Sequence, residues 1–389
     1  MHKNISPLTS LRFVAAILVL FHHSVPVFLP GVSAWGVQPG PQEYVGDVAL
    51  AFRISASFFF LLSGYVLSLA YLNRERAVDR RRFFAARFAR LYPLYLVVVV
   101  LDARKLFAAE IKGHGLIGLT KTAGIFIANA AALQGWYPAK LLRIDLPSWS
   151  LSAEILFCVC FPWLGALLWR LRGVRLWMTA LGLYAGGQAL VWGMRPHVKP
   201  DTLTYFPLFH ASTFALGILL ARWRSLEEKR EGQSGARPWQ ANLVLGLSIG
   251  GIILCVPLEP LFHVASPYQD GLLAPMFAGL IWALSAASSP LSRWLCAKWL
   301  LALGNASYAL YLIHFPILNL FQRFQWATGL FYPAYIALCV GLSLLSFRFF
   351  ETPARLWLTD WFRAHWLSNT EGRAAADHPR GLQPQGRCS

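Results

Sequence analysis

Long runs of apolar residues separated by short polar segments dominate the chain. The apolar residues cluster in blocks and do not alternate with polar ones as in a half-buried strand, and each block approaches the roughly 20 residues that a helix needs to cross a bilayer. Eleven blocks lie at residues 8–27, 52–72, 83–103, 116–134, 148–168, 174–193, 203–221, 241–257, 271–287, 300–320 and 331–350. The pattern predicts an all-α fold, a polytopic bundle of membrane helices.

Basic residues in the connecting segments indicate how the blocks are oriented, because Lys and Arg concentrate in cytoplasmic loops. The segment 73–90 holds seven arginines, and the segments 170–175 and 221–239 are also basic, as is the C-terminal end. The segments 26–51 and 257–270 contain no Lys or Arg. The first group is therefore predicted to be cytoplasmic and the second to lie outside.

This orientation leaves one block too many between two cytoplasmic segments. Three blocks lie between 73–90 and 170–175, where only an even number of crossings fits. The block 116–134 is the weakest of them because it contains Lys121 and Asn129, so we predict that it is re-entrant or lies on the outer surface. About ten transmembrane helices of the usual length then remain, with both termini in the cytoplasm.

Composition agrees with a membrane protein and defines the domains. Of 389 residues, 56% are hydrophobic and 14% charged. Residues 1–356 are predicted to form one membrane domain, and 357–389 a basic cytoplasmic tail that is disordered from about residue 368 because it is polar and rich in Pro and Gly. The first block is predicted to be retained, since no cleavage site of the A-x-A kind follows it.

The placement of the charged residues argues against a nucleic-acid partner, and the placement of the cysteines argues against a bound metal. The formal charge of +17 comes from loops that the positive-inside bias explains, so nucleic-acid binding is not expected. The cysteines are scattered singly, with no Cys-x-x-Cys pair and no cluster with histidine. We therefore predict no metal site.

The first apolar block carries ionisable side chains that are costly in a bilayer. Arg12 and His23 are eleven residues apart, which is three helical turns plus about 20°, so they share one face and lie about 16 Å apart along the axis. His22 points about 80° away from the direction of Arg12. Intramembrane ionisable residues usually mark a functional site, although Arg12 could also be an anchor that reaches the cytoplasmic headgroups.

Glu154 and His314 are expected at a similar depth to His23. Counted along their helices, His23 and His314 lie about 22 and 21 Å from the cytoplasmic side, and Glu154 about 9 Å below the outer surface. The three predict one polar pocket in the outer half of the bilayer. A carboxylate beside an imidazole orients the ring and suits it to act as a general base.

A structural pair, or the proton relay of a transporter or flippase, would use the same residue types as this pocket. A transporter would more often show paired repeats with broken helices in matching positions, and no convincing repeat occurs here. A scaffold without catalytic activity is a further alternative.

Six motifs occur in a fixed order: Arg12 and His23 with ten residues between them, then SFFFLLSGYVLS, RRFFAARFARLYP, PSWSLSAEILF, SYALYLIHFPI and FRFFETPAR. Together they resemble the acyltransferase-3 family of integral membrane O-acyltransferases, over about residues 6–356. The resemblance implies a fold of about ten transmembrane helices in the plasma (inner) membrane. It also implies transfer of an acyl group, usually acetyl, from cytoplasmic acyl-CoA to a hydroxyl of a surface carbohydrate or lipid-linked glycan.

The resemblance also implies roles for individual residues, with acyl-CoA as a co-substrate and no bound cofactor. The expected catalytic residues are His23, Glu154 and Arg12. The expected donor-binding residues are Arg82, Arg87 and Arg90, whose guanidinium groups suit the phosphates of CoA. The expected residues of the acceptor side or pocket are Ser63, Trp149, Ser150, Tyr308 and His314, with Ser307 in the same motif. His23 would either deprotonate the acceptor hydroxyl or carry the acyl group itself.

Overall fold

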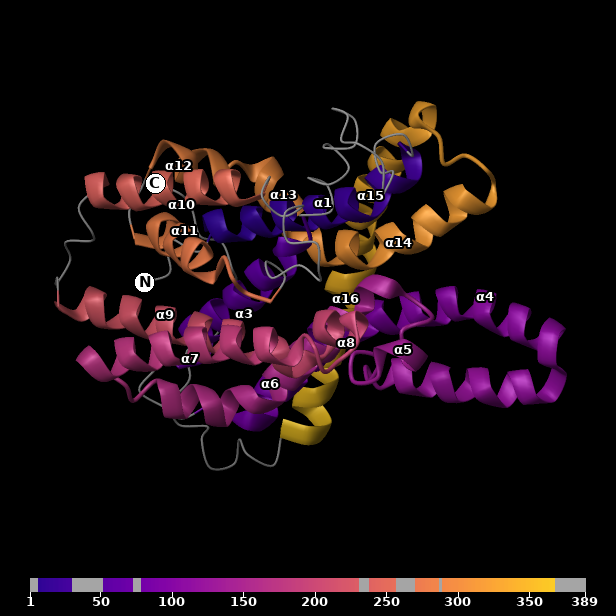
Figure 1. Cartoon of the computed structure of the whole chain (residues 1–389), viewed down its shortest axis with the longest axis horizontal. Coiled ribbons are helices and arrows are strands. Elements are labelled where there is room, and N and C mark those ends of the chain that lie inside the picture. The colour runs from indigo at the N-terminus through magenta and orange to yellow at the C-terminus, as the bar shows by residue number, and fades with distance from the viewer. Residues whose placement is uncertain are drawn as a thin grey trace.

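The computed structural model describes residues 6–29, 52–72, 78–230, 238–256, 270–286 and 289–367, and within them it contains helices and no strands (Figure 1). The predicted all-α class is confirmed. The α-helices are α1 (Ser6–Phe28), α3 (Ser55–Tyr71), α4 (Arg80–Ala130), α5 (Pro138–Leu141), α6 (Trp149–Leu168), α7 (Gly173–Met194), α8 (Pro200–Tyr205), α9 (Ala211–Arg230), α10 (Pro238–Cys255), α11 (Ala274–Ala286), α12 (Pro290–Leu295), α13 (Lys298–Asn305), α14 (Ser307–Arg323), α15 (Tyr332–Ser346) and α16 (Thr352–Phe362). Short 3-10 turns are η2 (Phe52–Ile54), η3 (Leu146–Ser148), η4 (Pro207–His210) and η6 (Gly329–Phe331), and π-helical turns are η7 (Phe347–Glu351) and η8 (Arg363–Leu367).

Several of these helices are long and apolar enough to cross a bilayer, which makes the chain an integral multi-pass membrane protein. Five stretches of the described chain meet this test by length and composition: Ser6–Phe28, Arg80–Ala130, Leu146–Leu168, Pro238–Cys255 and Gly329–Trp366. A sixth is formed if α13 and α14, bent by 60°, count as one span, while α3 and α11 are apolar but shorter. The number of about ten crossings stays a prediction.

Several apolar blocks of the sequence are divided where a single helix was expected. The block 203–221 is shared among α8, η4 and α9, and both α8 and η4 begin at a proline. Proline has no backbone N–H, so it starts a helix readily but interrupts one that is already running. The block 300–320 likewise becomes α13 and α14, which meet at Ala306.

The two blocks on either side of residue 110 form one helical hairpin within α4. The chain reverses at Gly115, whose φ of 56° and ψ of −131° lie in a region that glycine adopts without strain. The returning arm lies along the outgoing one, as the hydrogen bond from the hydroxyl of Tyr92 to the carbonyl of Ala130 shows. The hairpin tip extends away from the other helices (Figure 1). The block 116–134, predicted to be re-entrant or on the outer surface, is this returning arm, and its depth in the bilayer stays a prediction.

The predicted tail begins as a helix. α16 and η8 continue without a break through residue 367, so the chain remains helical beyond residue 357. The segment 368–389, which was predicted to be disordered, lies outside the described residues. Parts of the loops 26–51, 73–90 and 257–270 also lie outside them.

Among the described helices, α3 and α9 share an extensive and close contact. A side chain at Gly217 would collide with the backbone carbonyl of Leu61, and one at Gly64 with the carbonyl of Phe214. Small residues let helix backbones touch in this way in membranes, where dispersion contacts replace the hydrophobic effect. The hydroxyl of Tyr65 also donates to Ser285 Oγ over 2.8 Å, which ties α3 to α11.

We expect Gly217→Ala to loosen this contact, because even one methyl group meets rigid backbone. Its cost should be on the order of 2 kcal/mol, as for overpacked cores, and should appear as a lower melting temperature of the detergent-solubilised protein. The matched control is Gly182→Ala on α7, where nothing lies within reach of the added methyl. Equal melting temperatures for the two variants would contradict the close α3–α9 contact.

Candidate functional site

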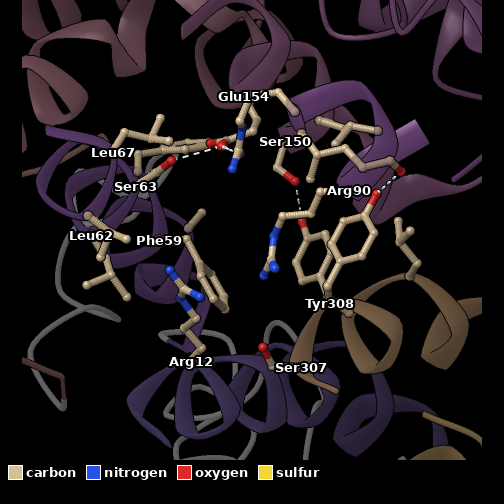
Figure 2. Close-up of a pocket in the computed structure, with 18 residues that line it drawn as sticks. Arg12, Phe59, Leu62, Ser63, Leu67, Arg90, Ser150, Glu154, Ser307 and Tyr308 are labelled. Atoms are coloured by element: carbon tan, nitrogen blue, oxygen red, sulfur yellow. Dashed lines mark hydrogen bonds and ion pairs between the residues drawn. The ribbon is translucent and has the colours of Figure 1, made fainter. Parts of the chain in front are cut away.

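A cavity of about 150 Å³ opens among α1, α3, α4, α6 and α14 (Figure 2). Its wall is largely apolar, with Phe59, Leu62 and Leu67 among the lining residues. Its polar lining residues are Arg12, Ser63, Arg87, Arg90, Ser150, Glu154, Ser307, Tyr308 and Tyr311. We call it the arginine cavity. It brings together most of the residues that the sequence motifs single out.

Helical spacing explains how α4 and α6 each direct two polar groups to one place. Arg87 and Arg90 are three residues apart on α4, and Ser150 and Glu154 are four apart on α6. Residues at these spacings lie on the same side of a helix. Each motif therefore contributes a polar edge to a helix whose other sides are apolar.

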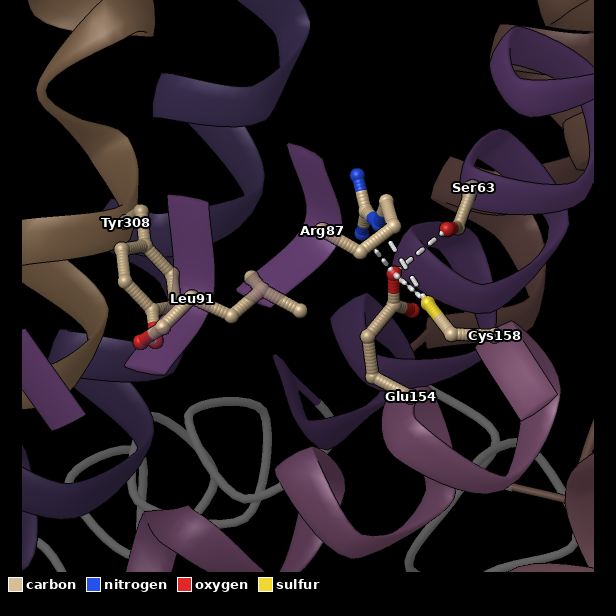
Figure 3. A network of polar contacts seen from close by, with 6 residues as sticks. All are labelled: Ser63, Arg87, Leu91, Glu154, Cys158 and Tyr308. Atoms are coloured by element: carbon tan, nitrogen blue, oxygen red, sulfur yellow. Dashed lines mark hydrogen bonds and ion pairs between the residues drawn. The ribbon is translucent and has the colours of Figure 1, made fainter. Parts of the chain in front are cut away.

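Glu154 is the centre of a polar network that joins α3, α4 and α6 (Figure 3). Its Oε1 lies 2.5 Å from Nη2 of Arg87 and accepts a 2.8 Å hydrogen bond from the hydroxyl of Ser63. The Nε of Arg87 donates to Cys158 Sγ at 3.3 Å. The side chains of Glu154 and Arg87 are each only 16% exposed, so this charge-assisted pair is a strong local constraint.

Arg12 and Arg90 make the cavity electropositive. Within the described part of the chain neither forms an ion pair with a carboxylate, and Figure 2 shows both guanidinium groups pointing into the same space. The charges of Arg87 and Arg90 repel Arg12, and only Glu154 offsets them there. With one carboxylate lining the cavity for three arginines, the cavity suits an anionic ligand.

Arg82, predicted to bind the donor together with Arg87 and Arg90, lies elsewhere. It is not among the residues that line the cavity. Its Nε pairs with Asp79 at 3.3 Å at the start of α4, where Asp79 also accepts a hydrogen bond from the Arg82 backbone N–H. Arg82 precedes Arg87 by five positions, so on a helix its side chain points about 140° away from that of Arg87. This difference in direction explains why Arg82 lies outside the cavity.

His23 and His314 face each other between α1 and α14. Nδ1 of His23 and Nε2 of His314 are 3.2 Å apart, and Nδ1 of His314 lies 3.1 Å from the carbonyl of Leu310. The Nδ1 of His23 also lies 3.0 Å from the carbonyl of Val19. In the neutral tautomers that fit these contacts, His23 donates through Nδ1, and His314 donates through Nδ1 to Leu310 and accepts through Nε2. The lone pair of His23 is then on Nε2, as a general base requires.

The predicted pocket of His23, Glu154 and His314 therefore needs correction. The two histidines meet as expected, but Glu154 lies in the arginine cavity beside Arg87, and His23 Nδ1 faces His314 and the carbonyl of Val19. Depth counted along a helix says nothing about lateral position. In addition, Arg87 lies about 10 Å into α4 and reaches Glu154, whereas the sequence placed it at the cytoplasmic face.

Tyr311 connects the two polar sites, although it was not among the site residues predicted from the sequence. It lines the cavity, and its ring centroid lies 6.2 Å from that of His314 and 6.0 Å from that of Phe59. Its hydroxyl donates to the carbonyl of Pro147 over 2.7 Å. The three-residue spacing from His314 on α14 was the available signal.

The other predicted pocket residues have definite partners. Tyr308 donates to the carbonyl of Leu91 over 2.6 Å, and Ser150 Oγ lies 2.7 Å from the Tyr311 hydroxyl. Ser307 donates to the carbonyl of Gly304 over 2.7 Å. Trp149 is buried against Phe60 and does not line the cavity, so it supports the core beside the site.

Sequence comparisons bear on this arrangement. A family model described as "Acyltransferase domain" matches residues 7–348. "Acyltransferase MdmB" of Streptomyces mycarofaciens is 28% identical over 306 residues, covering 71% of this chain and 73% of that protein. "O-acetyltransferase OatA" of Staphylococcus aureus is 27% identical over 334 residues, covering 76% and 51%.

"Peptidoglycan O-acetyltransferase OatA" of Listeria monocytogenes is 28% identical over 330 residues, covering 78% of this chain and 51% of that protein. The aligned region thus spans about half the length of the two OatA proteins. No solved structure matches the chain.

The pairing of Arg87 with Glu154 can be tested by removing one partner and then both. Arg87→Met leaves a poorly compensated buried carboxylate and should lower stability by about 3 kcal/mol, whereas Arg87→Met with Glu154→Gln should recover much of that loss. Thermal unfolding in detergent measures both. The control is Arg81→Met, because Arg81 is exposed on the same helix. A double variant no more stable than Arg87→Met would refute the coupling.

Asp145, in the loop before α6, offers a test by pH. It is fully buried, and neither carboxylate oxygen has a hydrogen-bond partner within the described residues. Burial, and secondarily the charge of Asp102, raise the pKa of Asp145 well above its ordinary value. The folded state therefore holds a proton that the unfolded state releases above about pH 4, so stability falls as pH rises from there through the raised pKa.

Asp145→Asn removes this penalty. We expect a higher melting temperature at pH 7 and a flatter dependence of the melting temperature on pH between 4 and 8. Asp201→Asn, at an exposed position of α8, should show neither effect. An Asp145→Asn protein that is as pH-dependent as the original would disprove the buried, protonated acid.

Proposed function

The chain belongs to this family of acyltransferases, and we propose that it transfers an acyl group, acetyl in the first instance, from acyl-CoA to a hydroxyl of a surface carbohydrate or lipid-linked glycan. The observation that carries the proposal is the presence of an electropositive cavity and a histidine pair in one bundle, joined by Tyr311. The electropositive cavity suits the anionic donor. The histidine pair suits removal of a proton from an alcohol.

On the donor side, the two arginines without a carboxylate partner would hold the phosphates of CoA. Guanidinium groups bind phosphate oxygens in a bidentate fashion. The cavity of about 150 Å³ is too small for a whole CoA molecule, so the nucleotide end would lie at its cytoplasmic opening. The pantetheine arm would then follow α1, along which Arg12 and His23 are about 16 Å apart.

On the acceptor side, His23 would take the proton of the hydroxyl through Nε2. The alcohol oxygen forms a bond to the thioester carbonyl carbon, the carbon–sulfur bond breaks, and the CoA thiolate leaves with the proton that His23 gives back. His314 holds the imidazole in the required tautomer. The same lone pair would serve if His23 first carried the acyl group itself, because both routes begin on that nitrogen.

Glu154 takes a different part from the one that its motif implied. It would act as a positioning residue that fixes Arg87 at the cavity wall and neutralises its charge. Ser63, which donates to Glu154, would hold the carboxylate in place. Arg12 and Arg90 then remain as the cations available to the donor.

The orientation in the membrane follows from charge. Basic segments between the helices favour about ten crossings with both termini in the cytoplasm of a plasma (inner) membrane. Donor binding at the arginine end and acceptor binding at the histidine end would then lie on opposite sides of the bilayer. One relative carries peptidoglycan in its name, which supports a cell-surface polysaccharide as the acceptor.

The proposal is tested with membranes, radiolabelled acetyl-CoA and a surface-glycan acceptor. His23→Ala should lower label transfer by at least about 100-fold, the usual contribution of a general base. His22 is the neighbouring control: its ring contacts that of His23 at a centroid distance of 4.7 Å, so His22→Phe, which keeps an aromatic ring, should retain activity.

Label transfer that survives His23→Ala would overturn the catalytic assignment. Solute uptake driven by a pH gradient and abolished by His23→Ala, without any label on glycan or protein, would favour a transporter. Full function of both Arg12→Ala and His23→Ala would favour a scaffold.

A further inference from the structure

Two tyrosines of α15, Tyr332 and Tyr335, reach the two helices that carry the histidine pair (Figure 1). They are three residues apart, so their side chains lie on the same side of α15. One of them contacts α1 and the other contacts α14. None of the six sequence motifs lies in α15, and neither tyrosine lines the arginine cavity.

Tyr335 holds the main chain of His314. Its hydroxyl donates to the backbone carbonyl of His314 over 3.1 Å, and the whole residue is buried. The ring packs against Phe321 of α14 at a centroid distance of 5.6 Å and against Phe28 of α1 at 5.0 Å. It therefore fills the space between α1 and α14 beyond the two histidines.

Tyr332 holds the residue that follows His23. The hydroxyl of Ser24 donates to the carbonyl of Leu20 over 2.7 Å and lies 3.0 Å from the Tyr332 hydroxyl. A serine hydroxyl has one hydrogen to give, so Tyr332 is the donor in the second contact. Its ring also stacks on Phe28 at 5.0 Å. The turn of α1 that carries His23 is thus fixed to α15.

Both histidine helices are weakened close to their histidine by a proline. Pro26 lies inside α1, three residues after His23, and Pro316 lies inside α14, two residues after His314. A proline supplies no N–H to the carbonyl four residues earlier, and its ring crowds that carbonyl. Contacts from a neighbouring helix are therefore needed to keep the two imidazoles in register.

We propose that Tyr332 and Tyr335 are positioning residues of the acyl transfer, a proposal that rests on the function proposed above. They hold α1 and α14 so that Nδ1 of His23 and Nε2 of His314 stay 3.2 Å apart. A hydrogen bond weakens steeply as its geometry departs from the optimum, so a small slide of either helix would release His23 and turn its lone pair. Tyr335 has the larger effect because it is fully buried, whereas Tyr332 is half-buried.

Acyl transfer by the detergent-purified full chain tests this, with rates normalised to the monodisperse protein. Tyr335→Phe keeps the ring and removes the hydroxyl, so kcat should fall about fivefold, as for the loss of one buried hydrogen bond. The KM for acetyl-CoA should stay the same, since Arg12 in the arginine cavity is about 16 Å from His23 along α1. Tyr332→Phe should lower kcat less.

The matched control is Ser343→Ala. Ser343 is also a buried hydroxyl residue of α15, but it donates to the carbonyl of Val340 in its own helix over 2.7 Å. Its removal should leave kcat unchanged.

A double-mutant cycle separates positioning from a general loss of stability. His314→Ala should itself lower transfer. Because Tyr335 acts through His314, adding Tyr335→Phe to His314→Ala should lower kcat by less than about twofold more. A purely structural role would give the same fivefold loss in both backgrounds.

Carbethoxylation of His314 by diethyl pyrocarbonate, followed by mass spectrometry, gives a second answer that needs no acyl transfer. Nε2 of His314 faces His23, and the residue is buried, so the wild type should react slowly. Tyr335→Phe should raise the rate about fivefold, by the same lost hydrogen bond, and Ser343→Ala should not.

Three outcomes would overturn the proposal: a kcat of Tyr335→Phe equal to that of the wild type, the same loss in the His314→Ala background, or equal His314 labelling in Tyr335→Phe and Ser343→Ala. A wild type that transfers no label would instead refute the proposed function. The labelling of His314 would then still show whether Tyr335 holds the histidine pair.

Discussion

The ion pair between Glu154 and Arg87 is the constraint on which the site depends. It joins α4 to α6, and through Ser63 to α3, so three helices are fixed at the wall of one cavity. In a low-dielectric interior a lone carboxylate or a lone guanidinium would be costly, and each makes the other tolerable there. The pair also shapes the electrostatics of the cavity, because it neutralises Arg87 and leaves Arg12 and Arg90 without an ion pair to a carboxylate of the described residues.

Two sites of different chemistry are held apart by two helices. α1 carries Arg12 and His23, and α14 carries Tyr308, Tyr311 and His314, in each case with the cavity group before the histidine in sequence. Both helices have a fixed rise per residue. The number of residues between the cavity group and the histidine on each helix therefore sets the distance between the arginine cavity and the histidine pair. Tyr311 lies where the two regions meet, and its hydroxyl donates to the carbonyl of Pro147 in η3, just before α6.

The sequence predicted what depends on local periodicity and missed what depends on tertiary placement. The all-α class, the meeting of His23 with His314, and a polar edge on several helices followed from apolar runs and helical spacing. The division of the block 203–221 at prolines, and the joining of 83–103 to 116–134 in one hairpin, depend on how a segment packs. The partner of Glu154 was missed for a related reason, since depth along a helix leaves its lateral neighbours undetermined.

The difference between the expected and the observed partner of His23 has a chemical consequence. A carboxylate beside an imidazole in a low-dielectric site stabilises the protonated imidazolium and so raises the basicity of the ring. A second imidazole, held in one tautomer by the Leu310 carbonyl, orients His23 without adding charge. In the neutral tautomer that fits this geometry, His23 carries its lone pair on Nε2. Glu154 lies beside Arg87 rather than beside His23, so among the described lining residues it supplies the one carboxylate of the arginine cavity and adds no charge next to the histidine pair.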